Sequence, residues 1–346
     1  MATEKEVLKA LSTVIDPDLG KDLVSLNMIE DLKVDGKNVS FTVVLTTPAC
    51  PLRNYFEATC RSVVLENTDA EHVDVRVTSK VVENKQVSLG QNKFKQIIAV
   101  GSGKGGVGKS TVAVAIAESL ALDGAKVGLL DADIYGPNIP RMLGVDGVEP
   151  AEEGQKMKPA EVDGMKVLSI GFFVEEGQPL IWRGPMLHSA IQQFLTDFDW
   201  GELDYLIVDM PPGTGDVQLS LSQLLPISGA VVVTTPQQVA VDDASRAVAM
   251  FKKMNIPVLG IVENMAYLEL PDGSRMAVFG EGGGEHLAFR EGVPFLGRIP
   301  LDPKIGQGGD IGSPLITRTS SSAAVEALRI VTRALAAESS KAALGA

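Results

Sequence analysis

From residue 97 onward, short runs of apolar and β-branched residues alternate with longer stretches whose apolar positions recur at helical spacing. Such runs are typical of buried strands, and the stretches between them are typical of helices that cover a sheet. The predicted strands are 97–100, 126–130, 166–170, 204–209, 230–234 and 258–262. The predicted helices are 111–122, 186–195, 241–254 and 321–337. This alternation predicts an α/β fold with a mostly parallel sheet flanked by helices.

The first 82 residues have a different pattern, which predicts a small α+β domain. Thr3 and Glu6 have the spacing of a capping box at the start of a helix. Its remaining predicted elements are strands at 29–34, 39–45 and 73–77 and a helix at 52–66. Residues 83–96 are polar and aperiodic, and they predict a linker to the α/β domain of residues 97–346. Within that domain, 145–180 predicts a surface excursion.

The composition is that of a soluble globular protein. The chain has 346 residues, of which 45% are hydrophobic and 22% charged, and its formal net charge is −13. An acidic chain argues against binding nucleic acid through a basic surface. No apolar run approaches the roughly 20 residues that span a bilayer, and residues 1–10 lack the apolar core of a signal peptide. We therefore expect a cytoplasmic protein that binds neither nucleic acid nor membrane.

Potential metal ligands are scarce, with two cysteines and three scattered histidines in the chain. The spacing of Cys50 and Cys60 is not a zinc pattern, and a cytoplasmic setting disfavours a disulfide. A complete metal site within one chain is not expected. Any metal would need a second subunit or a partner to complete its ligand set.

A glycine-rich sequence follows the first predicted strand of the α/β domain. Residues 103–110, Gly-Lys-Gly-Gly-Val-Gly-Lys-Ser, match the P-loop pattern, and the strand before and helix after them are the context that supports it. The main-chain N–H groups of such a loop point at phosphate oxygens, and Lys109 reaches the β- and γ-phosphates. The alternative is a glycine-rich turn without a ligand. The predicted nucleotide-binding residues here are Gly103, Gly105, Gly106, Val107, Gly108, Lys109, Ser110 and Thr111.

Carboxylates follow two of the predicted strands, at the edge of the sheet where ligands bind in α/β folds. Asp209 ends its strand in the manner of a Walker B motif, and with Ser110 it is predicted to hold Mg²⁺. Asp131 and Asp133 follow the strand before it, and a carboxylate near the γ-phosphate orients or deprotonates the attacking water. The alternative for both is a role as turn and capping residues.

The segment after Asp209 combines prolines and glycines, as expected of a loop that is rigid in one state and moves in another. Asp216, at its end, has an alternative role as the N-cap of the next helix. The predicted switch residues are Asp131, Asp133, Pro211, Pro212, Gly213, Thr214, Gly215 and Asp216.

These motifs resemble those of the deviant Walker A ATPases, which include MinD, ParA and the nitrogenase iron protein. Lys104 matches the signature lysine of that family, which implies that it stabilises the partner's nucleotide in an ATP-sandwich dimer. The alternative is a solvated lysine on a flexible turn. The match to the family's switch I implies the water-positioning role for Asp133, so the catalytic residues are Lys104, Lys109 and Asp133. Residues 209–216, Asp-Met-Pro-Pro-Gly-Thr-Gly-Asp, are distinctive of the Mrp/ApbC branch.

The resemblance covers nearly all of 95–340 and also implies an adenine site. Asn264 is the implied adenine contact, and the backbone of Pro300 and Leu301 flanks the base. The alternative for Asn264 is a turn residue at the end of a strand. In many Mrp/ApbC relatives a Cys-x-x-Cys pair holds a [4Fe–4S] cluster between two subunits, but residues 266–276 contain no cysteine.

Three segments of the N-terminal domain carry a second resemblance: 16–20 (Asp-Pro-Asp-Leu-Gly), 22–24 (Asp-Leu-Val) and 45–51 (Leu-Thr-Thr-Pro-Ala-Cys-Pro). They resemble the small iron–sulfur assembly domain found alone in SufT-type proteins, and the cysteine of that family's turn falls on Cys50. A thiol between two prolines and before a helix is expected to be partly exposed. The helix N-terminus is expected to lower its pKa, which suits a metal ligand or a transient cluster contact. The alternative for Cys50 is a small buried hydrophobe, and Cys60 is expected in the core. Two copies of each cysteine in a homodimer would supply four thiolates.

Residues and resemblance together predict a cytoplasmic ATPase that uses ATP and Mg²⁺ and works as an ATP-switched homodimer. By resemblance it carries an iron–sulfur cluster, [4Fe–4S] in relatives, to apoprotein clients. The alternative is a metal-free nucleotide switch or scaffold protein of the MinD or ParA type. Against that alternative, helix 321–337 lacks the basic amphipathic face of a membrane anchor, and the acidic chain has no evident DNA-binding surface.

Overall fold

The computed structural model describes residues 2–83, 87–89, 91–148, 156–173, 184–313, 315–316 and 322–345. The chain divides into two compact units: the smaller comprises Met1–Val82 with Leu344–Ala346, and the larger comprises Glu83–Ala343. Each unit has its own cluster of buried hydrophobic side chains. None of the helices in the described part of the chain combines the length and apolar character that a membrane span requires.

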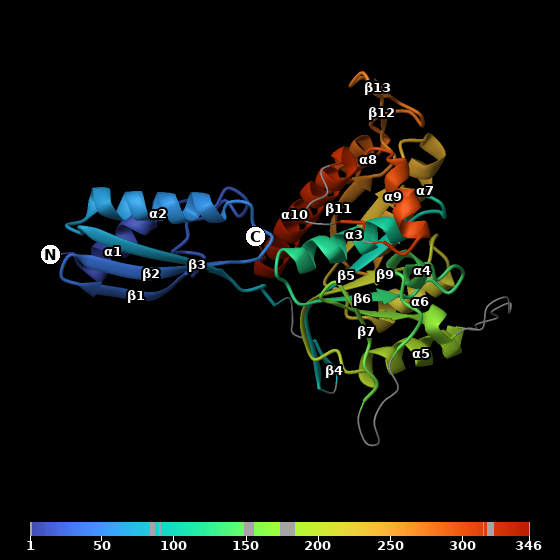
Figure 1. Ribbon diagram of the computed structural model, residues 1–346, viewed down its shortest axis with the longest axis horizontal. Coiled ribbons are helices and arrows are strands. Elements are labelled where there is room, and N and C mark those ends of the chain that lie inside the picture. The colour runs from blue at the N-terminus through green and yellow to red at the C-terminus, as the bar shows by residue number, and fades with distance from the viewer. Residues whose placement is uncertain are drawn as a thin grey trace. The chain divides into compact units, whose positions relative to one another are not determined.

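The smaller unit is a three-stranded sheet with two helices, as predicted (Figure 1). The Thr3 hydroxyl accepts a hydrogen bond from the Glu6 N–H and the Glu6 carboxylate accepts one from the Thr3 N–H, so the capping box is confirmed. The middle strand pairs antiparallel with the first and parallel with the third. The elements are α1 (Glu4–Leu11), β1 (Ile29–Asp35), β2 (Asn38–Leu45), α2 (Arg53–Asn67) and β3 (His72–Ser79).

The larger unit is built on a nine-stranded sheet in the order β14-β11-β10-β5-β9-β6-β8-β7, with β4 paired to β5. The pairs β7–β8 and β4–β5 are antiparallel and the others are parallel, which confirms the predicted fold class. The strands are β4 (Val87–Leu89), β5 (Asn92–Ser102), β6 (Val127–Asp131), β7 (Ala160–Val162), β8 (Met165–Ser169), β9 (Glu202–Asp209), β10 (Gly229–Thr234), β11 (Val258–Glu263) and β14 (Phe295–Arg298). A separate hairpin is formed by β12 (Leu268–Glu269) and β13 (Arg275–Met276).

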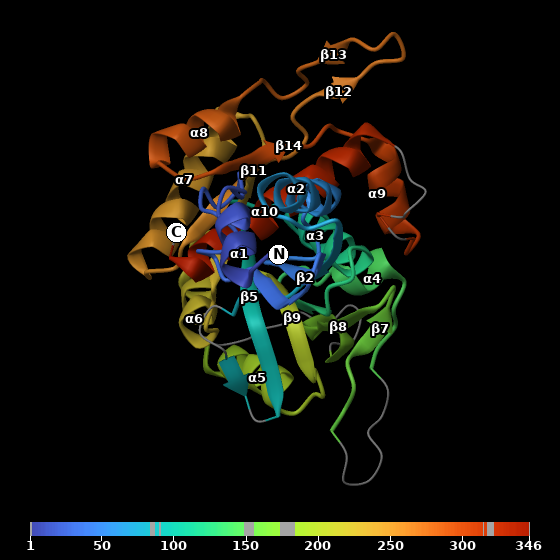
Figure 2. The same cartoon turned by 90° about the vertical axis from the view of Figure 1, so that its left-hand side faces the viewer.

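Helices cover the two sides of this sheet, and Figure 2 shows α3 on one side and α6 and α7 on the other. Both sides of the central strands are therefore buried, which is why they read as continuous apolar runs. The last helix continues beyond its predicted end, to Leu344. The helices are α3 (Lys109–Leu122), α4 (Ile139–Leu143), α5 (Gly184–Thr196), α6 (Asp216–Leu224), α7 (Gln238–Lys253), α8 (Gly283–Glu291), α9 (Pro303–Asp310) and α10 (Ala323–Leu344).

The predicted linker 83–96 is wrong in most of its length, because β4 (Val87–Leu89) and the start of β5, at Asn92, lie within it and pair with each other in the central sheet. Asn92 is fully buried, and its amide donates to the carbonyls of Leu195 and Phe198 while its carbonyl accepts from the main-chain N–H of Trp200. A polar residue can occupy a buried strand when partners distant in sequence satisfy its hydrogen bonds. Residues 84–86 and 90 lie outside the described part of the chain.

The predicted surface excursion 145–180 is also partly wrong, because β8 belongs to the central sheet and pairs with β6. Its side chains at Met165, Val167 and Leu168 are fully buried. Residues 149–155 and 174–183 lie outside the described part of the chain. The strand itself was predicted, at 166–170, but its place inside the central sheet was not.

Three neighbouring strands of the sheet end together and define the place of the site. Asp131 of β6 lies in register with Asp209 of β9, and Asp209 lies in register with Val100 of β5. The glycine-rich loop leaves β5 two residues later, after Ser102. Since parallel strands present their carboxyl ends at one edge, the loop and both carboxylates meet there.

Candidate active site

The glycine-rich loop joins β5 to α3, and its course depends on the absence of side chains at two positions. Gly108 has a φ of +82°, and a β-carbon there would lie 2.1 Å from Nδ2 of Asn264. A β-carbon at Gly103 would lie 2.0 Å from the main-chain carbonyl carbon of Asp243 in α7. Asn264 donates from Nδ2 to the carbonyl oxygen of Val107 at 2.9 Å, which ties the end of β11 to the loop. Glycine is required at both positions.

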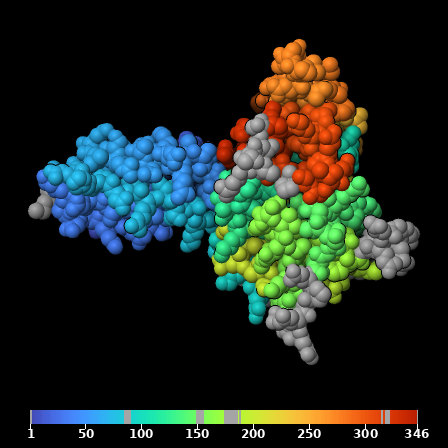
Figure 3. Space-filling view, in the orientation of Figure 1, coloured from blue at the N-terminus to red at the C-terminus, as the bar shows by residue number. Residues whose placement is uncertain are grey.

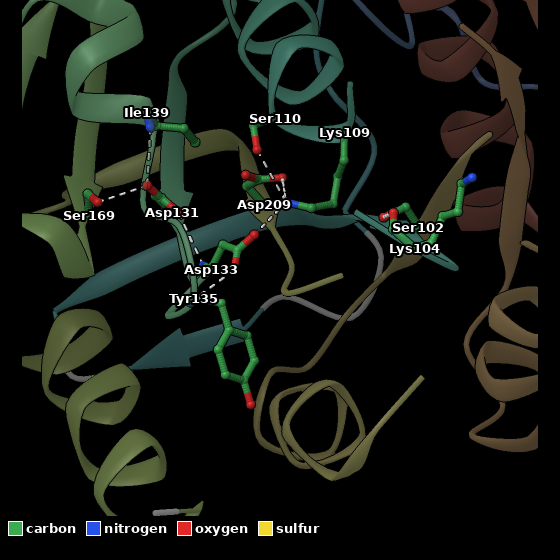
Figure 4. Close-up of polar contacts among 10 residues, drawn as sticks. All are labelled: Ser102, Lys104, Lys109, Ser110, Asp131, Asp133, Tyr135, Ile139, Ser169 and Asp209. Atoms are coloured by element: carbon green, nitrogen blue, oxygen red, sulfur yellow. Dashed lines mark hydrogen bonds and ion pairs between the residues drawn. The ribbon is translucent and has the colours of Figure 1, made fainter. Parts of the chain in front are cut away.

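Lys109, the first residue of α3, lies at the centre of a buried charge cluster (Figure 4). Its ammonium nitrogen is 2.6 Å from Oδ1 of Asp209 and 3.4 Å from Oδ2 of Asp133. It also donates to the hydroxyl of Ser110 at 3.3 Å. Lys109 is 6% exposed, so its charge requires these partners. The tertiary structure thus brings together four residues that the sequence had assigned to phosphate, Mg²⁺ and water.

Asp131 has a structural role in this cluster. It is fully buried, and its carboxylate accepts hydrogen bonds from the Ser169 hydroxyl of β8 and from the main-chain N–H groups of Asp133 and Ile139. Burial and the neighbouring carboxylate of Asp209 raise the pKa of Asp131 to about 7. The carboxyl group therefore holds the segment from Asp133 to the start of α4 against the end of the sheet.

The side chain of Asp209 is buried, and its two carboxylate oxygens differ in their hydrogen-bond partners. Burial raises the pKa of Asp209, and the ammonium of Lys109 opposes that shift. Oδ1 faces Lys109, while Oδ2 is buried without a hydrogen-bond partner among the described residues. A buried carboxylate oxygen left without a donor is costly unless a cation or donor reaches it. The Ser110 hydroxyl lies beside the same ammonium group, 3.3 Å from Lys109. The hydroxyl oxygen of Ser110 and the carboxylate of Asp209 suit Mg²⁺, which prefers oxygen ligands.

Lys104 is separate from this cluster. Figure 4 shows its side chain pointing away from Asp133 and Asp209. The Ser102 hydroxyl donates to its main-chain carbonyl at 2.9 Å, which shapes the start of the loop. Lys104 is half-buried and lines the cavity above the loop.

The predicted switch segment follows β9 and passes beside the loop. Gly213 donates from its main-chain N–H to the Ser102 carbonyl at 2.9 Å, and Pro212 lines the cavity. The N-cap of α6 is Gly215, and Asp216 is the first helical residue. The alternative role of Asp216 as the N-cap is therefore wrong. Pro211 and Thr214 occupy the same loop between β9 and α6.

A cavity of about 540 Å³ opens above the loop, a volume suited to a nucleotide. Its floor is formed by the predicted residues of the loop and switch I. Its far wall consists of side chains and backbone of α4 and α9 that the sequence analysis did not single out. The lining residues are Ser102, Lys104, Gly105, Gly106, Gly108, Lys109, Ser110, Thr111, Asp133, Tyr135, Gly136, Asn138, Arg141, Met142, Pro212, Ile305, Gly306, Gly309 and Asp310.

The residues implied for adenine lie beside this cavity rather than among its described lining residues. Asn264 is 7% exposed and directs its amide to the loop. Pro300 is buried, and Leu301 donates from its main-chain N–H to the Tyr267 carbonyl at 2.7 Å. The glycines of α9 are visible in the sequence, but no local sequence signal indicated that this helix forms the far wall together with α4.

Residues 93–336 match the family model of NUBPL iron-transfer P-loop NTPases. The chain belongs to this family. Residues 4–77 match the model of an iron-sulfur cluster assembly protein. An iron-sulfur cluster carrier protein of Synechocystis sp. is 50% identical over 355 residues, covering 99% of this chain and 100% of the relative. One from Deinococcus radiodurans is 52% identical over 334 residues, covering 96% of this chain and 94% of the relative.

Solved structures of the P-loop NTPase class share the fold of the larger unit. A nucleotide-binding protein from Archaeoglobus fulgidus in complex with ADP is 41% identical, with a TM-score of 0.57, over 64% of this chain and 88% of that one. The cell division ATPase MinD of Pyrococcus furiosus is 25% identical, with a TM-score of 0.52, over 69% of this chain and 97% of that one.

The thiol pKa of Cys50, in the smaller unit, is raised, whereas the sequence analysis predicted a lowered value. Burial raises the pKa of its thiol, and the carboxylates of Asp16 and Asp18 add to this, while a hydrogen bond from the Leu52 backbone lowers it less. The expectation that the helix N-terminus favours a thiolate is therefore wrong. A helix end offers only a fraction of a charge, and here it does not offset burial and two carboxylates.

Cys60 is fully buried in the core of the smaller unit, as predicted, and burial raises the pKa of its thiol to about 12. A ligand set that includes Cys60 would require this core to open, so the hypothesis of four thiolates from two Cys50 and two Cys60 is wrong. Among the described residues, no group of three histidine, cysteine or acidic side chains is arranged to hold a metal ion.

Proposed function

We propose that this member of the iron-transfer NTPase family binds and hydrolyses ATP in the cavity above the 103–111 loop. In this proposal a homodimer uses the ATP cycle to carry iron–sulfur clusters to apoproteins in the cytoplasm. The observation that carries the proposal is the buried cluster of Lys109, Asp133 and Asp209 at the floor of a nucleotide-sized cavity. The carrier names of the relatives favour this function over a metal-free nucleotide switch.

Lys109 is the group that exchanges partners when phosphates bind. Its ammonium faces the carboxylates of Asp133 and Asp209 and also borders the cavity. The phosphate chain of ATP offers a higher negative charge to the same ammonium, and the main-chain N–H groups of the loop add fixed donors. Transfer of Lys109 to the phosphates frees the carboxylates for their other roles.

Mg²⁺ fits the oxygen atoms around Lys109, one of which, Oδ1 of Asp209, loses its partner when Lys109 moves to the phosphates. The Ser110 hydroxyl and the Asp209 carboxylate would hold it, consistent with the buried Oδ2 of Asp209 that lacks a protein partner among the described residues. When bound, Mg²⁺ neutralises charge on the phosphate oxygens.

Asp133 is placed to orient the attacking water. Its Oδ1 accepts a hydrogen bond from the Tyr135 N–H at 3.2 Å, and its Oδ2 faces Lys109. Once Lys109 binds phosphate, this Oδ2 loses its ion-pair partner, and Asp133, unlike Asp209, is among the residues that line the cavity. Lys104 points away from this floor, and in our proposal it reaches the nucleotide of the second protomer.

The iron–sulfur cluster is the cargo in this proposal, and Cys50 is its contact in the smaller unit. Cys50 is half-buried, whereas Cys60 is enclosed. One Cys50 from each protomer supplies two thiolates, half of the usual set of four. External thiols or the client protein supply the rest, which suits a cluster that must be released. Metal binding must displace the proton from the thiol, because burial raises its pKa.

The test is anaerobic reconstitution with iron and sulfide of three proteins: wild type, Cys50→Ser and the matched control Cys60→Ala. We expect about four irons per dimer in wild type and in Cys60→Ala, and loss of the bound iron in Cys50→Ser. Addition of an apo-ferredoxin and Mg-ATP should then transfer the cluster. Absence of bound iron in all three proteins would refute the carrier function and leave a nucleotide switch.

A further inference from the structure

A second cavity of the larger unit lies between the last turns of α3 and the side of α10. Its volume is about 290 Å³, and it shares no described lining residue with the nucleotide cavity. On the face that Figure 3 shows, the red atoms of α10 and the blue-green atoms of the α3 region reach the surface. The described lining residues of this second cavity are Ser119, Leu122, Asp123, Arg329 and Arg333.

Two arginines of α10 give this cavity positive charge. Arg329 and Arg333 are half-buried and four residues apart, so they lie on the same side of the helix. No acidic residue lies three or four positions from Arg333 along α10, and Glu338, the nearest carboxylate after it, pairs with Lys341 at 2.7 Å. Arg333 has no hydrogen bond or ion pair with the described part of the chain. Two like charges at this spacing repel each other, and an anion between them removes that repulsion.

Ser119 offers a buried hydrogen-bond donor on the α3 side of the cavity. It is 4% exposed, and its hydroxyl oxygen has no hydrogen-bond partner among the described residues. A buried hydroxyl without a partner is costly, so a ligand that accepts a hydrogen bond from it is favoured. Asp123 also lines the cavity, but its charge offsets only one of the two arginines. The cavity thus combines a positive charge with a buried polar group that lacks a protein partner in the described residues.

The donors and the volume together indicate the chemistry of the ligand. Guanidinium groups donate paired hydrogen bonds to phosphate oxygens, and the serine hydroxyl adds a further donor. The volume of about 290 Å³ is about half that of the nucleotide cavity, and it falls at the lower end of the range for ligand pockets, roughly 300–1,000 Å³. The cavity therefore suits a phosphate group with a small organic part rather than a second nucleotide.

We propose that Arg329, Arg333 and Ser119 form a second anion site, which binds a small phosphate-bearing molecule at the end of α3 remote from Lys109. Lys109 and Ser119 belong to the same helix, and their separation in the sequence corresponds to about 15 Å along the helix axis. One phosphate group cannot reach both residues. The inference does not depend on the ATP binding proposed above.

The experiment is a calorimetric titration with inorganic phosphate, in the presence of Mg²⁺ and a saturating non-hydrolysable ATP analogue that fills the phosphate loop. The variants are Arg333→Gln and Ser119→Ala. Ser339→Ala is the matched control, because it removes another buried hydroxyl without a described partner, in α10 but not among the lining residues.

We expect saturable phosphate binding in wild type and in the control. Arg333→Gln should weaken it about tenfold or more, because a hydrogen bond to a charged group is lost, and Ser119→Ala should weaken it about two- to tenfold. Acetate, a planar anion with a single charge, should bind more weakly than phosphate. Both variants should bind the ATP analogue as wild type does, which shows that they are folded.

Three results would overturn the inference. Absence of saturable phosphate binding in wild type would leave the arginines as groups that stabilise the carboxyl end of α3. Equal phosphate affinity in wild type and Arg333→Gln would mean that phosphate binds elsewhere. Acetate binding as tight as phosphate binding would refute the ligand class. Failure of wild type to bind the ATP analogue would instead refute the proposed ATPase, and the dependence of phosphate binding on Arg333 would still test the second site.

Discussion

The nucleotide site and the Cys50 turn both hold an ionisable group in buried or half-buried surroundings, and they differ in the charges around it. Lys109 lies within ion-pair distance of Asp133 and Asp209. Cys50 instead lies near the carboxylates of Asp16 and Asp18, and its thiol pKa is raised by burial and by both charges. The first site therefore holds its charges in ion pairs within the protein, whereas the second forms a thiolate less readily than a free cysteine unless a metal or a partner displaces the proton.

The largest expected effect is at the nucleotide site. Lys109→Ala leaves two buried carboxylates without their cation and removes the phosphate contact, so ATP turnover should fall by about 10³-fold or more. Phosphate release under saturating ATP measures this effect. Turnover near the wild-type rate would contradict the P-loop assignment.

Lys104→Ala is the matched control in the same loop, because its side chain points away from the buried cluster. It should retain ATP binding and lose ATP-dependent dimerisation, which light scattering with and without ATP detects. Loss of ATP binding in Lys104→Ala would show that both lysines act within one protomer.

Asp133→Asn tests whether the second carboxylate near Lys109 has the catalytic role. The amide keeps the shape of the side chain and its acceptor for the Tyr135 N–H, but it loses the charge that orients water. We expect turnover to fall by about 10²-fold while ATP binding remains. Unchanged hydrolysis would place the base elsewhere.

Glu118, in α3, is a third ionisable group in buried surroundings, and its hydrogen-bond donors come from the main chain. It is 2% exposed and accepts hydrogen bonds from the main-chain N–H groups of Leu315 and Ile316, yet burial raises its pKa to about 7. The folded protein therefore binds more protons than the unfolded chain between pH 4.5, the ordinary pKa of a glutamate, and about pH 7. Stability from this group is present at low pH and is lost as the pH rises through that window.

The comparison of wild type with Glu118→Gln measures this loss. Between pH 5.5 and 7.5 the free energy of unfolding of wild type should fall by about 2 kcal/mol more than that of Glu118→Gln, which cannot ionise. Urea unfolding at both pH values provides the measurement. Parallel pH profiles would show that Glu118 is ionised in the folded protein throughout.

The smallest expected effect concerns the Cys50 thiol. Because its pKa is raised, alkylation by iodoacetamide at pH 8 should be slower in the folded protein than in the same chain in denaturing urea. In the folded protein the alkylation rate should continue to increase with pH beyond the pH at which the alkylation rate of the unfolded chain reaches its plateau. Cys60 is enclosed in the core, so Cys60→Ala leaves Cys50 as the single reporter. Faster alkylation in the folded state would indicate a stabilised thiolate.

Most of the larger unit was predictable because its signals are local. A strand, a glycine-rich turn and a helix follow one another directly in the 97–122 region, and apolar runs mark strands buried on both faces. The first half of β5 was missed because its polar residues are satisfied only in three dimensions. Lys95, for example, pairs with Asp204 at 2.7 Å.

The sequence by itself determined the fold class, the phosphate loop and the identities of Lys109, Asp133 and Asp209, since backbone conformation and residue type carry that information along the chain. Only the tertiary structure decided the direction of the Cys50 pKa shift and the far wall of the cavity. The thiol pKa depends on burial and on carboxylates from another turn, Asp16 and Asp18. The wall depends on α9 meeting α4, two helices that lie far apart along the chain, and no local pattern encodes that proximity.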